Sequence, residues 1–346
     1  MASVIRRVIG KAKRILGGAS DLERFLETSG VITLDGYVPP RFPIDLVYTW
    51  VDGNDPVLQA KRAAYDGSDQ RHRYTDHQEL RYSLRSINEY LPWINHIYIV
   101  TDGQRPEWLA EHPKVSIVDH TQILAAEYLP TFSSHVIESA LHRIPGISEH
   151  YIYLNDDMVF LRPMHPEDFY TSAGLVYGIV SASMLPDNAK GHLHSVTAQM
   201  NALEMINRRI ECSFRHRMTQ TYYPQRRSVV EDLEREFADD FHAMRQRRFR
   251  TAQDFVTCTT LHAMWAYGTG RGLLRTNRTN YISVRSPDAP GSYGRVIAAK
   301  GKPYARSSLC LNDAPSADGN EAPGYAESLR QFCESYFPRA SPFEAA

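Results

Sequence analysis

The hydrophobic residues of the chain gather in short runs, each followed by polar and turn-forming residues. Short runs rich in β-branched and aromatic residues predict buried β-strands. Such runs end in aspartate at residues 44–52, 96–102, 115–119 and 151–157. Three of them are separated from the next by enough chain for a helix, which is typical of parallel strands. We therefore expect an α/β fold with a mostly parallel, Rossmann-like sheet and helices on both faces.

Apolar residues at helical spacing predict the helices that cover this sheet. Leu80, Leu84, Ile87 and Leu91 form one stripe along residues 77–94. Further helices are expected within 129–151, on both sides of 222–224 and at 327–337.

Composition sets the scale of the fold. With 346 residues, of which 42% are hydrophobic and 23% charged, the chain can bury the core of one large domain. The formal net charge of −1 argues against nucleic acid as a partner. We predict a single domain over residues 41–337, with a mainly helical, Arg-rich insertion at 162–250 and a tail at 338–346.

Residues 1–40 form a basic amphipathic leader and a linker. In a helix over residues 4–16, apolar side chains share one face and basic ones flank it, as in helices that lie on anionic membranes. A helix packed on the domain, or solvated, has the same pattern. The four cysteines lack zinc-site or C-x-x-C spacing, so we expect reduced thiols in a cytoplasmic protein, either free or peripheral at the inner face of the cell membrane.

The acids that follow the strands carry the candidate chemistry. Ligands of open α/β sheets bind beyond the carboxyl ends of the strands, so one crevice could be lined by Asp52, Asp102, Asp119, Asp156 and Asp157. Each acid alone could equally be part of a simple turn, but their coincidence at four strand ends favours a site. The adjacent carboxylates of Asp156 and Asp157 can hold one hard cation against a nucleoside diphosphate.

Arginines supply the complementary charge. Arg81 and Arg85 lie off the apolar stripe of the helix at 77–94, where they could receive phosphate. They could equally form ion pairs with nearby acids. Arg250 precedes an apolar run at a predicted helix start, a position that suits phosphate binding or a structural ion pair.

These motifs resemble, in order, the four conserved regions of the Stealth family. That family comprises bacterial capsular and exopolysaccharide phosphotransferases and the catalytic part of the lysosomal-enzyme N-acetylglucosamine-1-phosphotransferase. The first region is similar to IDLVYTWVDGNDP, and the second to ELRYSLRSINEYLPWINHIYIVTDGQRPEWL with LPTFSSHVIESALHRIPGISEHYIYLNDDM. The third is similar to the segment around SVVEDLEREF, and the fourth to LCLND. The resemblance covers most of residues 44–337.

The resemblance implies a core similar to that of GT-A nucleotide-sugar glycosyltransferases. It also implies transfer of a hexose 1-phosphate, such as N-acetylhexosamine 1-phosphate, from a UDP-sugar to a hydroxyl of a polysaccharide or oligosaccharide acceptor, in capsule or exopolysaccharide synthesis. The attack falls on phosphorus, and UMP is released. Family members use a divalent cation, Mg²⁺ or Mn²⁺. Apart from the resemblance, the clustered arginines of the insertion at 162–250 suit an anionic acceptor or the diphosphate, although interleaved acids could equally pair with them on helix faces.

The resemblance also implies roles for individual residues. The family's NDD segment matches Asn155, Asp156 and Asp157, whose acids would bind the cation and position the diphosphate, and Asn312 and Asp313 would return to the same metal. Contacts to the nucleotide sugar are expected from Asp52, Gly53, Asp55, Arg81, Arg85, Asp102 and Asn155. Arg250 matches an arginine expected to stabilise phosphate charge in the transition state.

One position departs from the family pattern. Where relatives usually have a histidine two residues before a proline, this chain has Gln220, which cannot accept a proton as imidazole can. We name His216 as the candidate base, with His194 or an aspartate as alternatives. Two other functions stay open, and the second of them follows from this departure. One is a metal-dependent glycosyltransferase that breaks the sugar–oxygen bond, and the other is a non-catalytic partner that binds nucleotide sugar or glycan.

Overall fold

The computed structural model describes residues 39–65, 76–187, 194–210, 213–277, 279–313 and 320–345. The predicted membrane-binding segment at 4–16 lies outside the described residues. The chain divides into residues 1–39 and a unit of residues 40–346, and the description below concerns the second. None of its described helices is long and apolar enough to cross a membrane.

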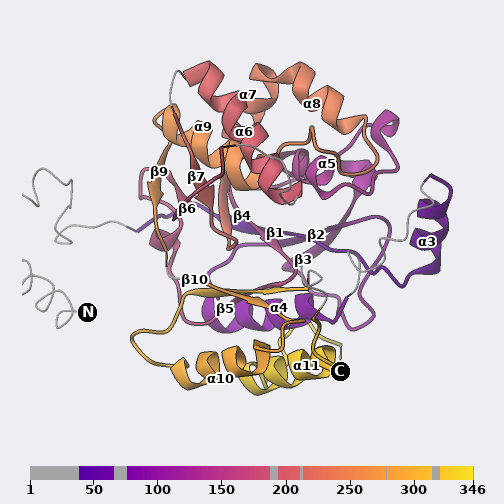
Figure 1. The fold of residues 1–346 in the computed structure, drawn as a ribbon, viewed down its shortest axis with the longest axis vertical. Helices are drawn as coiled ribbons and strands as arrows, with labels where there is room; N and C mark the ends of the chain where they lie inside the picture. Colours follow the sequence, from indigo (N-terminus) through magenta and orange to yellow (C-terminus); the bar gives the residue numbers. More distant parts are fainter. Residues whose placement is uncertain are drawn as a thin grey trace, which may run out of the picture. The chain divides into compact units, whose positions relative to one another are not determined.

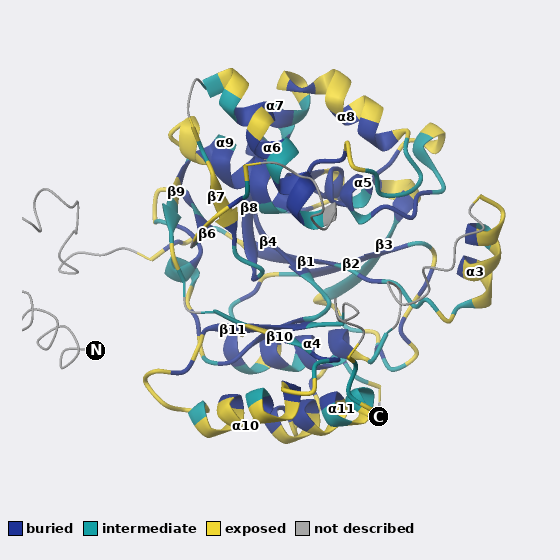
Figure 2. Ribbon diagram, in the orientation of Figure 1, coloured by how far each residue is buried: buried dark blue, intermediate teal, exposed yellow. Residues whose placement is uncertain are grey.

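Five strands form the central sheet, in the order β3-β2-β1-β4-β8 (Figure 1). The first four are parallel, as predicted: β1 (Ile44–Thr49), β2 (Ile97–Thr101), β3 (Val115–Asp119) and β4 (His150–Asn155). β8 (Tyr223–Arg226) comes from the Arg-rich region and pairs antiparallel with β4. β1, β2 and β4 are almost entirely buried (Figure 2), which explains why they are continuous hydrophobic runs.

Helices cover both faces of this sheet (Figure 1). On one side lie α4 (Glu79–Tyr90), α10 (Ala289–Ala299) and α11 (Tyr325–Tyr336). On the other lie α5 (Ser134–Glu138), α6 (His194–Ile210), α7 (Arg227–Glu236), α8 (Ala238–Arg245) and α9 (His262–Gly268). The short α3 (Pro56–Ala63) follows β1. The predicted apolar stripe of α4 is buried at Leu80, Leu84 and Ile87.

Two smaller sheets were not indicated by the sequence pattern. β5 (Met158–Phe160), β11 (Ser308–Asn312) and β10 (Thr279–Ser283) form one, and β7 (His216–Met218), β6 (Val176–Met184) and β9 (Gly272–Arg275) form the other. The region 162–250 therefore contributes strands as well as helices. β5 follows β4 after a turn at 156–157, so this turn joins the central sheet to the β10-β11-β5 sheet.

The C-terminal residues predicted as a tail pack on the domain. Phe343 is buried, and its carbonyl accepts a hydrogen bond from the amide of Ala110 at 2.9 Å. The amide of Ala345 donates to the carbonyl of Trp108 at 2.8 Å. The tail is therefore part of the same folded unit as far as Ala345.

Candidate active site

The register of the central sheet brings the ends of β1 and β4 together. Thr49 at the end of β1 pairs with Asn155 at the end of β4, so the acids beyond them leave the sheet side by side. Asp52 lies close enough to Asp76 to act on it electrostatically, and Asp76 acts in the same way on Asp156. The predicted convergence of strand ends therefore holds for β1 and β4.

Four carboxylates gather at this point: Asp76, Glu79, Asp156 and Asp157, hereafter the acid cluster. Burial, with the charges of Asp157 and Asp76, raises the pKa of Asp156 well above its ordinary value. Burial and the charge of Asp156 do the same to the pKa of Glu79. Like charges this close disfavour one another's ionised form, and a cation would relieve that cost.

The surroundings of Asp157 fit a cation ligand. The thiol of Cys310 donates to Asp157 Oδ2 at 3.3 Å, whereas Asp157 Oδ1 is buried without a hydrogen-bond partner. Burial raises the pKa of this carboxyl. A buried oxygen without a partner is costly unless a ligand satisfies it. Among the described residues no three His, Cys, Asp or Glu side chains are arranged as a ready-made metal centre, so the fit rests on the Asp156 and Asp157 pair.

Asn312 and Asp313, predicted as metal ligands, lie at the end of β11 beside this pair. Arg285 holds Asp313 with two hydrogen bonds of 2.7 and 3.0 Å, and His77 lies 3.3 Å from it. Although burial opposes the shift, these contacts lower the pKa of Asp313. Its carboxylate is thus committed to Arg285, unlike that of Asp157. Asn312 Oδ1 accepts a hydrogen bond of 2.8 Å from the hydroxyl of Tyr281.

Arg250 is connected to the NDD segment through a buried network. Its guanidinium donates to the hydroxyl of Ser134. Ser134 and Tyr153 both lie within hydrogen-bonding reach of Glu138, and the hydroxyl of Tyr153 donates to Asn155 Oδ1 at 2.8 Å. Burial raises the pKa of Glu138, and the charge of Arg250 opposes that rise. The structure therefore links Arg250 to Asn155 through side chains, without placing it on the acid cluster itself.

The turn after β1 is held by Gln104, which follows β2. Its side chain accepts from the amide of Asp52 at 3.0 Å and donates to Asp55 Oδ2 at 2.8 Å. Asp55 also caps α3 through the amide of Val57. The Gly53 carbonyl accepts a hydrogen bond from Gln59. Asp55 thus has a structural role, while Asp52 stays beside the acid cluster.

The ends of β2 and β3 form a separate group. Asp102 pairs with Lys61 at 2.7 Å. Asp119 caps the 3₁₀ turn His120–Gln122 through the amide of Thr121 at 2.9 Å. Asp102 thus pairs with a lysine, and among the described contacts none joins Asp102 or Asp119 to the acid cluster.

Arg81 and Arg85 both form ion pairs with an acid, one of the two roles considered for them. Both guanidinium groups bind the Glu344 carboxylate, Arg81 through Nε at 2.5 Å and Arg85 through Nε at 2.8 Å and Nη2 at 2.7 Å. Arg85 also donates to the carbonyl of Phe337 at 2.8 Å. Both arginines are thus engaged by the C-terminal residues, and their contact with phosphate stays a prediction.

The candidate base His216 lies on β7 and is exposed. Among the described contacts none joins His216 to the acid cluster, so its catalytic role stays a prediction. The charge of its neighbour Arg217, in contrast, acts on Tyr281 at the site. The side chain of His194 lies outside what the structure describes.

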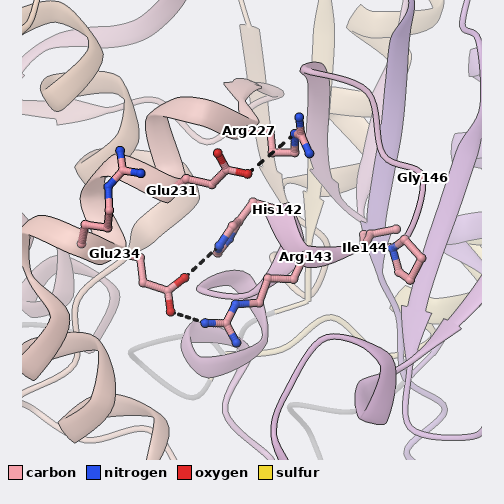
Figure 3. A pocket seen from close by; sticks show the side chains of 9 residues that line it. His142, Arg143, Ile144, Gly146, Arg227, Glu231 and Glu234 are labelled. Carbon is pink, nitrogen blue, oxygen red and sulfur yellow. Dashed lines mark hydrogen bonds and ion pairs between the residues drawn. The ribbon is translucent and has the colours of Figure 1, made fainter.

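A groove of about 560 Å³ lies elsewhere, between 142–146 and α7 (Figure 3). Residues 142–146 precede β4, and α7 follows β8, which runs antiparallel to β4. The groove is therefore at the amino end of β4, away from the acid cluster. Glu234 lines it and binds His142 at 2.9 Å, together with Arg143 and Arg245. The charges of this network are paired, so we interpret it as structural.

Several site residues escaped prediction from the sequence. Asp76 precedes the predicted helix in a polar segment without periodicity, His77 is its first residue and lies off the apolar stripe, and Arg285 follows the short strand β10. Cys310 looks in the sequence like an ordinary apolar strand residue. The sequence indicated a site role for Cys310 only by its place two residues before Asn312. The acids of the NDD segment, in contrast, follow a strong strand pattern.

The comparisons with known proteins concern the family of the chain. Three family models match in order: Stealth protein CR1, conserved region 1, over residues 42–70; CR2, conserved region 2, over 73–177; and CR3, conserved region 3, over 221–267. The capsular polysaccharide phosphotransferase LcbA of Neisseria meningitidis is 37% identical over 79% of this chain and 78% of its own length. The chain belongs to the Stealth family. The acid cluster thus lies within the second Stealth region.

Other Stealth relatives differ in length. LcbA of Aeromonas hydrophila is 33% identical over 90% of both chains. The exopolysaccharide phosphotransferase SCO6023 of Streptomyces coelicolor is 40% identical over 88% of this chain, and the match spans 53% of that relative. The chain thus spans about half the length of that relative. Among solved structures, the galactosyltransferase LgtC, in complex with donor and acceptor sugar analogues, matches at a TM-score of 0.42 and 11% identity over 84% of this chain and 95% of that chain.

Proposed function

We propose that this Stealth protein transfers a sugar 1-phosphate from a UDP-sugar to a hydroxyl of a polysaccharide or oligosaccharide acceptor, in capsule or exopolysaccharide synthesis. The observation that carries the proposal is the acid cluster, which brings Asp76 and Glu79 to the NDD segment at the end of β4. The Neisseria and Aeromonas relatives support it, because both are named capsular polysaccharide phosphotransferases and this chain matches most of the length of each.

The proposed reaction forms one phosphorus–oxygen bond and breaks another. The acceptor hydroxyl attacks the phosphorus that carries the sugar, its proton passes to a base, and UMP leaves with the oxygen that bridged the two phosphates. The bond between the anomeric carbon and its oxygen stays intact. Negative charge is spread over the phosphoryl oxygens and the leaving group, so the reaction depends on nearby positive charge.

Different residues would bind the metal, the nucleotide and the phosphate. Asp156 and Asp157 would hold Mg²⁺ or Mn²⁺, which when bound neutralises diphosphate charge. The unpartnered oxygen of Asp157 and the mutual repulsion of the two acids support this assignment. Asp52 would face the nucleotide. Arg250 is held by its network near Asn155, where its charge would stabilise phosphate.

The cytoplasmic location belongs to the same proposal. Among the described cysteines, Cys258, Cys310 and Cys333 are buried free thiols, which suits a reducing compartment. Contact of residues 4–16 with an anionic membrane at the inner face is a further expectation.

The test is to measure UMP and UDP release from a panel of UDP-sugars with an oligosaccharide acceptor, with Mg²⁺ or with a chelator. We expect UMP release that requires the metal and falls about 100-fold or more in Asp157→Asn. The matched control is Asp119→Asn, an acid at another strand end that caps its own turn and should keep most activity. UDP release would identify a glycosyltransferase, and saturable nucleotide binding without release would identify a binding partner.

A further inference from the structure

Tyr281 presents an exposed aromatic ring beside the acid cluster. It lies on β10 and is 53% exposed. In the register of this sheet Tyr281 is opposite Cys310 on β11, and Cys310 is opposite Met158 on β5. Opposite residues of neighbouring strands direct their side chains to the same face. Since the Cys310 thiol contacts Asp157, the Tyr281 ring projects on the face that carries this acid.

The ring is held in one orientation by the site itself. The Tyr281 hydroxyl donates to Asn312 Oδ1 at 2.8 Å. A ring fixed in this way loses little conformational entropy when a ligand packs on it.

The position of Tyr281 indicates which substrate it meets. The turn at 156–157 joins two sheets: β1 with Asp52 lies on one side, and β11 with β10 on the other. The nucleotide is assigned to the side of Asp52, so the opposite side is available to the second substrate. Arg217 on β7 lies within electrostatic range of Tyr281, which adds hydrogen-bond donors to that side.

We propose that the ring of Tyr281 is the platform on which a sugar ring of the acceptor glycan stacks. The proposal rests on the proposed function, because it names the place of the second substrate of that reaction. The C–H face of a pyranose is apolar and weakly positive, and it matches the negative face of an aromatic ring, while its hydroxyl groups remain at the edge for hydrogen bonding. Stacking there would set an acceptor hydroxyl beside Asp157.

The test separates acceptor binding from donor binding in the full-length protein. The probes are UDP with Mg²⁺, measured by calorimetry, and a panel of oligosaccharides of hexose and N-acetylhexosamine units, measured by saturation-transfer NMR. We expect Tyr281→Ala to weaken saccharide binding and raise the acceptor KM about tenfold, with UDP affinity unchanged. Tyr281→Phe keeps the ring and should retain most saccharide binding.

A matched control is Tyr304→Ala. Tyr304 is 61% exposed and precedes the start of β11. The Tyr281 hydroxyl, in contrast, contacts Asn312 at the end of β11, beside the site. This variant should bind every probe as wild type does. A loss of UDP affinity in Tyr281→Ala with unchanged saccharide binding would overturn the proposal and place the uracil base on the ring. Wild-type saccharide binding by Tyr281→Ala would overturn it as well.

The two proposals can fail separately. A wild-type protein that releases UMP, with Tyr281→Ala matching it in acceptor KM, contradicts only the platform. A wild-type protein that binds UDP but releases no UMP contradicts the proposed function, and the saccharide titrations then decide the platform alone. A wild-type protein that binds none of the saccharides contradicts the platform.

Discussion

At the residue scale, the buried carboxylate of Asp157 is proposed to bind the metal but lowers the stability of the fold. Burial raises the pKa of its carboxyl above that of an exposed aspartate, so the ionised form weakens the fold above that pKa, and the penalty is relieved as the pH falls through it. Asp157→Asn removes this penalty at neutral pH. Without metal we expect its free energy of unfolding to be equal to or about 1 kcal/mol higher than that of wild type.

Urea unfolding at pH 7 in chelator measures this difference. Addition of Mg²⁺ should then raise the midpoint of wild type but leave that of Asp157→Asn unchanged, since a ligand stabilises only the state that binds it. Strong destabilisation of Asp157→Asn in chelator would show that the carboxylate is structural.

Glu234, in contrast to Asp157, is a carboxylate whose ionised form stabilises the fold. Although burial opposes the shift, hydrogen bonds from His142 and Arg245 hold the pKa of Glu234 well below its ordinary value. Glu234→Gln should lower the free energy of unfolding by about 3 kcal/mol at pH 7, because the buried guanidinium of Arg245 loses its carboxylate.

Thermal and urea unfolding test this loss against Glu236→Gln on the same helix. Glu236 pairs with Arg209, which is 58% exposed, so its removal should cost no more than about 0.5 kcal/mol. Equal stability of the two variants would contradict a structural role for the network of Figure 3.

At the scale of elements, Glu344 fastens the C-terminal residues to α4. Burial alone would raise the pKa of Glu344, but hydrogen bonds from Arg85, Ser341 and Arg81 lower it to about 2. Because the folded pKa is lowered, this stabilisation is complete above the ordinary value of 4.5 and is lost as the pH falls toward 2. Glu344→Gln should cost about 2 kcal/mol at pH 7 and little at pH 2.

Hydrogen exchange of the Ala110 and Ala345 amides, which join the C-terminal residues to the segment at 108–110, reports release of these residues locally. Both should exchange faster in Glu344→Gln at neutral pH. Glu334→Gln, which removes an exposed pair with Arg330 on α11, should leave them protected. Equal protection in both variants would show that Glu344 does not hold the C-terminal residues.

The elements also show what the sequence could predict. β1, β2 and β4 are long hydrophobic runs buried on both faces, so their pattern alone identifies them. β7 (HRM) and β8 (YPQR) are short and polar, and β8 contains Pro224. Such strands form because a neighbouring strand offers them hydrogen bonds, and local sequence does not encode that neighbour.

At the scale of the whole molecule, the site depends on contacts between distant segments. The NDD segment could be predicted because its acids follow a strand and match a known motif. Asp76, Cys310 and Tyr281 reach it only through the packing of α4 and of the β10-β11-β5 sheet. The sequence left open whether Arg81 and Arg85 pair with acids or receive phosphate, because the acid that both bind, Glu344, lies more than two hundred residues away in the chain.

The central claim is that phosphorus, not the anomeric carbon, is attacked at the acid cluster. The most direct measurement uses a UDP-sugar whose oxygen between the anomeric carbon and phosphorus carries a heavy-isotope label, followed by mass spectrometry of both products. We predict the label in the acceptor product, which gains sugar and phosphate together, and unlabelled UMP. Label in released UDP, with an acceptor that gains only the sugar, would contradict the account.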